Sequence, residues 1–336
     1  MAVYQPNELK MEDKKFSCII YGAPGVGKTT LACSAPRPYL IDLDKGIERV
    51  NARHRVVCSR IDKYEELAED FKTEAFQAAE TVIIDTGGAL ITYLQDWAVR
   101  TDPANRMAKS NTISQKGWGA VKREFLHFVD TIKTNYNKNI IFIFHSVEEK
   151  DKDGNPNQRL LCEGSARNIV WQPCDFGGYV YMAGGQRKIA FTPGDTYFAK
   201  GCFGITGEYE IPSLSDTTPN TFMTRTFAAA RANITAEKDF FEQEKRDYET
   251  VMEQGRALVD GVNTTDDAAR FAGELKKLPH VLTSETEIRS LFKERIHALG
   301  ITWDKAAGQW IQKIPEATKG GEYLEDKDRW TSLSIS

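Results

Sequence analysis

The chain has 336 residues, enough for one large domain and an additional segment, and its 41% hydrophobic and 27% charged residues are ordinary for a globular protein. No apolar run approaches the roughly 18 residues of a membrane span, and residues 1–15 are polar and charged, unlike a secretion signal. The net charge of −4 excludes a wholly basic fold, so any contact with nucleic acid must come from a local patch.

Cysteine usage indicates a reducing compartment. Six cysteines are scattered along the chain and form no C-x-x-C pair. We therefore expect free thiols rather than disulfides or a zinc site, as in a cytoplasmic protein.

A phosphate-binding loop is the most specific motif of the chain. Residues 22–30 read Gly-Ala-Pro-Gly-Val-Gly-Lys-Thr-Thr and match G-x-x-x-x-G-K-[ST], between an expected strand over 16–21 and an expected helix. Glycines let the backbone turn so that N–H groups face phosphate oxygens. Lys28 would reach the β- and γ-phosphates of ATP, and the Thr29 hydroxyl would hold Mg²⁺. The other expected nucleotide contacts are Gly22, Pro24, Gly25, Val26, Gly27 and Thr30.

Apolar strands and amphipathic helices alternate through the first half of the chain. Strands are expected over 39–44, 54–57, 81–86 and 139–146. Helices are expected over 64–79, 90–97 and 118–132. Continuous apolar strands that alternate with helices predict an α/β fold, in which helices cover both faces of a mainly parallel sheet.

The pattern changes after residue 147. A turn over 153–156 precedes short strands that should pair antiparallel at the late edge of the sheet, over 179–182, 187–191 and 196–200. From residue 235 the pattern is helical and charged, with helices expected over 237–255, 265–278 and 284–299. The expected organisation is an ATPase core over 1–212, a linker over 213–234 and a helical C-terminal region of unknown role over 235–336.

Strand ends supply the carboxylates that a phosphate loop needs. Asp85 closes the strand over 81–86, which we expect to neighbour the strand before the phosphate loop, and it would order Mg²⁺ with Thr29. Asp44 ends an earlier strand at the carboxyl edge of the sheet, where a nucleotide should lie, and would orient the attacking water. Glu48 is the alternative base, and Asp44 is preferred because strand-end acids are better placed.

Two further features would complete an ATPase site. His145 ends the most apolar strand at the same edge, and in a RecA-like core such a polar residue senses the γ-phosphate and passes its presence to the following loop. Arg187 and Lys188 lie on a later strand, where a basic residue would complete the site of a neighbouring subunit in an oligomeric ATPase. The alternative for His145 is a buried histidine satisfied by the backbone, and the alternative for Arg187 and Lys188 is ordinary surface charge.

Residues 100–116 form the candidate DNA loop, with four cations against one acid and hence a local charge of +3. Such a loop would track the phosphates of a single strand, although an ordinary solvated connection has the same composition. The four cations are Arg100, Arg106, Lys109 and Lys116. Residues 147–167 are a second candidate, less favoured because they are net acidic.

Together these motifs resemble the phage RecA-superfamily ATPases, in particular the short RecA-core proteins of the Sak-four type, a phage nucleotide-binding and single-strand-annealing family. The resemblance extends over about residues 14–212 and rests on 22–30, 41–44, 82–86, 116–119 and 143–146. In this comparison Asp44 matches the position of the catalytic acid, which is Glu in RecA, and His145 replaces the Gln sensor of RecA.

The resemblance implies a RecA-like P-loop core that uses ATP and Mg²⁺, binds single-stranded DNA and assembles into rings or filaments. It further implies a single-strand-binding protein as partner, no membrane, and the cytoplasm of a bacterial host as location. The expected function is a DNA-stimulated ATPase in phage recombination or annealing. Two alternatives stay open: a replication helicase or loader-type motor, which processive unwinding would favour, and a nucleotide-gated scaffold with slow hydrolysis, which ATP-dependent oligomerisation would favour.

Overall fold

The computed structural model describes residues 11, 13–107, 112–150, 152–163, 166–214 and 218–313. The chain divides into two compact units, Met1–Lys238 and Asp239–Ser336. No helix among the described residues is both long and apolar enough to span a bilayer.

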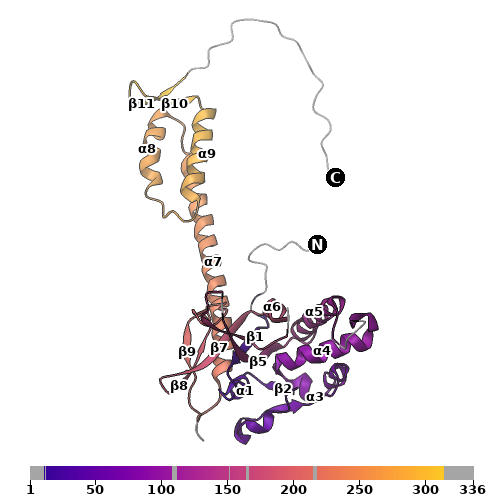
Figure 1. The fold of residues 1–336 in the computed structure, drawn as a ribbon. Helices are drawn as coiled ribbons and strands as arrows, with labels where there is room; N and C mark the ends of the chain where they lie inside the picture. Colours follow the sequence, from indigo (N-terminus) through magenta and orange to yellow (C-terminus); the bar gives the residue numbers. More distant parts are fainter. Residues whose placement is uncertain are drawn as a thin grey trace. The chain divides into compact units, whose positions relative to one another are not determined.

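In the described part of the first unit, nine strands form one sheet in the order β3-β2-β4-β5-β1-β7-β8-β9, with β6 paired to β5 (Figure 1). Strands β3 to β7 in this order run parallel, while β8, β9 and β6 pair antiparallel with their neighbours. The predicted fold class is therefore confirmed. The strands are β1 Ser17–Gly22, β2 Pro38–Asp42, β3 Val57–Ser59, β4 Thr81–Asp85, β5 Asn139–Lys150, β6 Pro156–Leu160, β7 Phe176–Ala183, β8 Gln186–Ala190 and β9 Glu208–Glu210.

Helices cover both faces of this sheet, because alternate residues of each strand point to opposite sides. Ile19 of β1 packs in one core with Phe125 of α5, and Ile20 packs in the other core with Phe227 of α7. Figure 1 shows α4 and α5 beside each other on the first of these faces. The helices are α1 Lys28–Ala32, α2 Leu67–Asp70, α3 Glu74–Ala78, α4 Gly87–Thr101, α5 Gln115–Asp130, α6 Ala166–Trp171 and α7 Phe222–Asp260. Shorter helical turns are η2 Ile47–Arg49, η3 Ala52–His54, η4 Tyr64–Glu66, η5 Pro103–Asn105 and η6 Thr131–Asn135.

Three predictions of individual elements were wrong. The strand expected over 54–57 is displaced, because His54 ends η3 and strand β3 begins only at Val57. The helix expected over 64–79 is divided among η4, α2 and α3, because the Thr73 side chain caps a new helix by accepting a hydrogen bond from Phe76 N–H at 3.2 Å. The strand expected over 196–200 is absent among the described residues, since the chain turns back so tightly that Gly194 bridges Tyr197. Strand β9 pairs with β8 instead.

The segment expected to be a linker, 213–234, is helical from Phe222 onward. The first turns of α7 bury Met223, Phe227, Ala230 and Ile234 in the core of the first unit. The boundary between the two units falls inside α7, after Lys238. A segment that buries an apolar face at helical spacing is part of the first unit, although its Ser, Thr and Pro residues suggested a linker.

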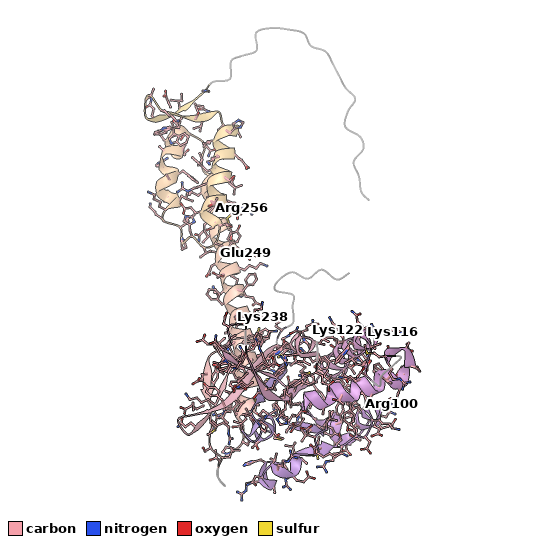
Figure 2. The ribbon with its side chains drawn as sticks, in the orientation of Figure 1. Arg100, Lys116, Lys122, Lys238, Glu249 and Arg256 are labelled. Atoms are coloured by element: carbon pink, nitrogen blue, oxygen red, sulfur yellow. The ribbon has the colours of Figure 1, made fainter. Side chains whose placement is uncertain are left out.

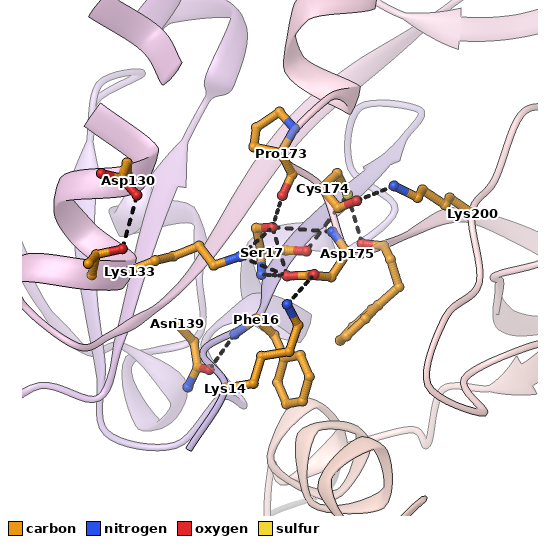
Figure 3. A network of polar contacts seen from close by, with 12 residues as sticks. Lys14, Phe16, Ser17, Asp130, Lys133, Asn139, Pro173, Cys174, Asp175 and Lys200 are labelled. Carbon is orange, nitrogen blue, oxygen red and sulfur yellow. Dashed lines mark hydrogen bonds and ion pairs between the residues drawn. The ribbon is translucent and has the colours of Figure 1, made fainter. Parts of the chain in front are cut away.

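A polar network holds β7 against β1 at the base of the sheet (Figure 3). The Asp175 carboxylate accepts hydrogen bonds from Ser17 N–H at 2.8 Å and from Lys133 Nζ at 3.0 Å, and it pairs with Lys14 Nζ at 3.0 Å. Burial tends to raise the pKa of Asp175, but the Ser17 N–H and the two ammonium groups outweigh burial and lower the pKa below its usual range. The network thus fixes the start of β7 beside β1.

The second unit is mainly helical, as predicted, and it also contains a short antiparallel hairpin. The C-terminal part of α7 packs with α8 (Thr265–Leu275) and α9 (Ser284–Ala298). The rings of Phe271 and Phe292 stack with their centroids 3.8 Å apart. The hairpin consists of β10 (Ile301–Asp304) and β11 (Gln309–Gln312), and its Trp310 lies against this core.

Candidate nucleotide site

The phosphate loop lies between β1 and α1 and owes its shape to two glycines. Gly25 and Gly27 have φ angles of 78° and 89°, a left-handed conformation that other residues rarely adopt. A side chain at Gly27 would also meet the Arg187 guanidinium, whose Cζ lies 2.9 Å from the position of a Cβ atom. The loop backbone therefore depends on glycine at this position for its conformation, whereas the long Arg187 side chain could shift to make space.

Lys28 is folded back over this loop. Its side chain is buried, and Nζ donates hydrogen bonds to the carbonyl oxygens of Gly22 at 3.0 Å and Ala23 at 2.8 Å. Burial lowers the pKa of Lys28 to about 8, although the nearby Asp85 and Asp44 carboxylates oppose this shift. An anionic phosphate is the natural partner for an ammonium group held in this way, because it would offset the cost of burying the charge.

Thr29 and Asp85 form the pair predicted to hold a metal ion. The Thr29 hydroxyl donates to Asp85 Oδ2 at 2.7 Å. Burial raises the pKa of Asp85, and the hydrogen bond from Thr29 acts in the opposite direction. One hydroxyl and one carboxylate fit the oxygen ligands that Mg²⁺ takes when nucleotide phosphates and water supply the rest. In the described part of the chain, no cluster of three or more His, Cys, Asp or Glu could hold a metal without such help.

The strand order corrects one expectation about Asp85. Strand β4 is not the neighbour of β1, because β5 lies between them and pairs with both. In the register, Gly22 of β1 lies opposite His145 of β5, and Ile143 of β5 lies opposite Asp85 of β4. His145 therefore stands between the phosphate loop and the residues that follow β4 and β2.

Asp44 and His145 meet in this central position. His145 Nε2 lies 3.6 Å from Asp44 Oδ2, and His145 Nδ1 lies 3.5 Å from Lys28 Nζ. Thr86 Oγ1 donates to Asp44 Oδ1 at 3.2 Å. The bond to His145 is the main reason that the pKa of Asp44 is lowered, against the opposing effect of burial. Asp44 is thus kept as a carboxylate that can accept a proton.

The backbone fixes Asp44 relative to the metal pair. The N–H groups of Leu43 and Asp44 donate to the Asp85 carbonyl oxygen at 2.8 and 3.0 Å. These two bonds tie the end of β2 to the end of β4. The predicted base and the predicted metal-site acid therefore belong to one rigid edge of the sheet.

Glu48, the alternative base, lies away from this arrangement. Its side chain is exposed, and Oε1 pairs with Arg60 at 2.5 Å, which lowers the pKa of Glu48. Asp42 is buried and accepts hydrogen bonds from Gly46 N–H at 2.8 Å and from Arg60 Nε at 2.9 Å, so it stabilises the turn after β2. The geometry therefore favours Asp44 as the base.

A cavity of about 160 Å³ brings most of the predicted site together. Its wall includes Arg49, which the sequence analysis missed. Arg49 ends η2, and its guanidinium lies against Gly46. The sequence feature that could have identified Arg49 is its position as a basic residue shortly after the strand-end acid Asp44. The predicted residues that line the cavity are Gly25, Gly27, Lys28, Thr29, Thr30, Asp44, Asp85 and His145.

Arg187 and Lys188, expected to act on a neighbouring subunit, lie on β8. The Arg187 guanidinium contacts the phosphate loop of its own chain at Gly27. Its Nε is buried and has no hydrogen-bond partner within the described residues. Lys188 Nζ pairs with Glu208 at 2.6 Å. A role in a neighbouring subunit stays a prediction for both.

The candidate DNA loop is already partly neutralised. Arg100 and Lys116 are labelled in Figure 2. Arg100 pairs with Glu65 at 2.8 Å, and Lys116 pairs with Asp102 at 2.6 Å. Arg106 is exposed, whereas Lys109 lies outside the described residues. Exposed ion pairs are weak and rearrange readily, so phosphates could still recruit these side chains. Their role in DNA binding stays a prediction.

A comparison with models of protein families identifies the family of the chain. A family model described as an AAA domain matches residues 14–203, more than half of the chain, so the chain belongs to this AAA-domain family. It is a P-loop ATPase, with the phosphate loop, Asp44, Asp85 and His145 inside the matched region.

Sequence searches against curated proteins give no match. Among solved structures, 76 chains match, including a KaiC-like protein from the hyperthermophilic archaeon Pyrococcus horikoshii. That protein is 12% identical, with a TM-score of 0.32, and the match covers 59% of this chain and 90% of the archaeal chain.

Proposed function

We propose that this protein hydrolyses ATP with Mg²⁺ and couples hydrolysis to single-stranded DNA in phage recombination or annealing, as an oligomer. The observation that carries the hydrolytic part is the continuous series of Lys28, His145 and Asp44 beside the Thr29–Asp85 pair. These residues line one cavity, which supports the proposal that Lys28 binds phosphate, His145 acts as sensor and Asp44 acts as general base.

Each residue of the site has a separate role in the proposed hydrolysis. Lys28 leaves the loop carbonyls and binds the β- and γ-phosphates, which keep it protonated. Thr29 and Asp85 would hold Mg²⁺, which neutralises the developing charge on these phosphates when it is bound. Asp44 accepts a proton from the attacking water while Thr86 and His145 hold its two carboxylate oxygens in position.

His145 is placed to report on the nucleotide. It stands at the start of the hairpin formed by the end of β5 and by β6, and its carbonyl oxygen accepts a hydrogen bond from Leu161 N–H at 2.8 Å. A shift of the imidazole on phosphate binding would move both ends of this hairpin. For this reason the proposed DNA-binding surface includes this hairpin, most of which lies within the second candidate segment, residues 147–167.

The test is ATP turnover by the full chain with and without single-stranded DNA. Lys28→Ala serves as the inactive variant, and Lys122→Ala, an exposed lysine on α5, serves as the matched control. We expect strong stimulation by DNA in the wild type and in Lys122→Ala, and no turnover in Lys28→Ala.

Each alternative function has its own outcome in this assay. An ATP turnover rate that is the same with and without DNA would contradict DNA-coupled catalysis. Slow ATP turnover together with ATP-dependent oligomerisation would favour the nucleotide-gated scaffold. Processive strand separation would favour a helicase or loader-type motor.

A further inference from the structure

A second cavity, of about 190 Å³, lies in the first unit outside the nucleotide site. It is called the aromatic pocket here and is lined by Tyr21, Trp171, Phe198, Arg159, Arg167 and Asn168. Tyr21 directly precedes Gly22, the first residue of the phosphate loop. Arg159 lies on β6, in the hairpin that begins at His145. The pocket therefore adjoins both parts of the chain that would respond to a nucleotide.

Three aromatic rings give the pocket a rigid apolar wall. The rings of Trp171 and Phe198 pack edge to face with centroids 4.8 Å apart, and Tyr21 packs edge to face on Trp171 at 6.3 Å. Tyr21 is fully buried, and its hydroxyl donates to the Phe198 carbonyl oxygen at 2.5 Å and accepts from Phe198 N–H at 3.1 Å. These bonds fix the backbone of Phe198, whose side chain is nevertheless 39% exposed. A large aromatic ring held in place and left open to solvent is suited to stacking.

Two guanidinium groups complete the wall. Arg167 makes a two-pronged ion pair with Glu149, at 2.8 and 2.7 Å, while its Nε is buried and has no hydrogen-bond partner within the described residues. The half-buried Arg159 side chain makes no hydrogen bond or ion pair with any residue that the structure describes. Arg159 is therefore the cation at this pocket without a direct carboxylate partner. The Glu149 carboxylate, whose pKa is lowered mainly by its hydrogen bond to Arg167, also lies within electrostatic range of Arg159.

Size and chemistry restrict what the pocket can take. At 190 Å³ it is smaller than the roughly 300–1,000 Å³ of pockets that enclose whole small-molecule ligands. It has room for one planar ring system. Aromatic side chains and guanidinium planes are the groups on which single-stranded nucleic acids stack their bases, and an arginine without a direct carboxylate partner attracts the phosphate beside a base.

We propose that the aromatic pocket binds one unstacked base of single-stranded DNA, with Phe198 stacking on the base and Arg159 holding an adjacent phosphate. This inference rests on the proposed function, because it assumes that the protein binds a single strand. It adds a defined base-binding position, distinct from the cations of residues 100–116. Because Tyr21 directly precedes the phosphate loop and Arg159 lies in the hairpin from His145, a base bound in the pocket would influence the ATPase site.

The test compares Phe198→Ala with Tyr209→Ala in the full chain. Tyr209 on β9 is 38% exposed and serves as the matched aromatic control. Binding of a labelled oligothymidylate is followed by fluorescence anisotropy in the presence of ATP and Mg²⁺. Phe198→Ala should weaken binding by roughly 5- to 150-fold, the range expected for loss of one base–aromatic stack. Tyr209→Ala should bind as the wild type does, and DNA-free ATP turnover should be unchanged in both.

A second arm separates base stacking from other effects. On an abasic oligonucleotide of the same length, Phe198→Ala and the wild type should bind equally, because there is no base to stack. Arg159→Gln should lower the slope of affinity against salt concentration by about one phosphate contact, whereas Arg123→Gln, an exposed control, should not. A penalty for Phe198→Ala that persists on the abasic strand would overturn the assignment.

The remaining outcomes distinguish this inference from the proposed function. If the wild type binds the strand and Phe198→Ala binds equally well, the pocket is not a base site, although the proposed function stands. If the wild type binds no single strand in any nucleotide state, the proposed function itself fails. Competition by free thymidine monophosphate would assign the pocket to a mononucleotide. Loss of self-association in Phe198→Ala, seen by sedimentation at unchanged strand affinity, would assign it to a second copy of the chain.

Discussion

The imidazole of His145 lies beside the carboxylate of Asp44, with Nε2 3.6 Å from Oδ2. Asp44 follows β2 and His145 lies within β5, and these strands are not neighbours because β4 lies between them. They meet because both side chains extend past the carboxyl edge of a parallel sheet, where ligand sites of such sheets are found. The contact joins the residue that would remove a proton from water to the residue that would detect phosphate.

The first prediction separates the two candidate bases. Asp44→Asn should lower the rate of ATP cleavage by roughly 10²- to 10⁴-fold, the usual contribution of a general base. Glu48→Gln should cleave ATP at nearly the wild-type rate, because Glu48 is exposed and bound to Arg60. Single-turnover hydrolysis measures the chemical step, and binding of a fluorescent ATP analogue confirms that both variants still bind nucleotide. Full activity in Asp44→Asn together with loss in Glu48→Gln would reverse the assignment.

The second prediction concerns pH and Lys28, whose pKa is about 8 in the free protein. Below pH 8 the side chain is charged before ATP binds. Above pH 8 it has lost its proton, and the phosphates must restore that proton, so ATP affinity should fall by up to about tenfold per pH unit toward the ordinary lysine value. Over the same pH range the free energy of unfolding of the nucleotide-free protein rises with pH, because the unfolded chain holds a proton that the folded chain has lost.

Calorimetry in buffers of different ionisation enthalpy measures this effect directly. ATP binding near pH 8.5, about half a unit above the Lys28 pKa, should take up a substantial fraction of one proton. Lys28→Arg provides the control, since an arginine remains protonated throughout this range. Equal proton uptake in the wild type and in Lys28→Arg would assign the titration to another group.

The third prediction tests Arg49, the cation that the sequence analysis missed. Arg49→Ala should lower ATP affinity or kcat by about 10- to 100-fold, as expected for loss of a hydrogen bond to a charged group. The exposed Arg123→Ala on α5 is the control and should leave both parameters unchanged. Steady-state kinetics over a range of ATP concentrations separates a loss in KM from a loss in kcat. Unchanged kinetics in Arg49→Ala would exclude any contact with the phosphates.

The sequence predicted the class of fold and the residues that gather in one cavity, but not the order of the strands. The phosphate loop, Asp44, Asp85 and His145 were found because a motif or a strand end defines each of them, and all lie in one cavity. That these residues bind and hydrolyse ATP stays a prediction. Arg49 carries no motif, and only the path of η2 brings it to the cavity.

Local sequence patterns did not predict the features that depend on packing between distant segments of the chain. Hydrophobic periodicity identifies a strand but not its neighbours, so the position of β5 between β1 and β4 was not predicted. The aromatic pocket joins Tyr21, Trp171 and Phe198, which come from separate parts of the chain. The prediction of one helix over 64–79 was wrong for a local reason, because Thr73 caps the start of a new helix.

The fourth prediction concerns the network around Asp175. Its carboxylate is partly buried and binds Ser17, Lys14 and Lys133, so Asp175→Asn leaves two ammonium groups without their counter-charge. Loss of a buried partner of this kind costs about 3 kcal/mol, which should appear as a lower urea midpoint. Asp102→Asn removes an exposed pair with Lys116 and should leave the midpoint unchanged.

The pH dependence of the same variant provides an independent check. The pKa of Asp175 is lowered in the folded protein, so its contribution to stability is complete above the ordinary aspartate value of 3.8 and is lost as the pH falls through the folded pKa. The difference in stability between the wild type and Asp175→Asn should therefore shrink on acidification. A difference that stays constant down to the pH of acid unfolding would show that the asparagine acts through packing, and that the charges around Ser17 contribute little to holding β7 against β1.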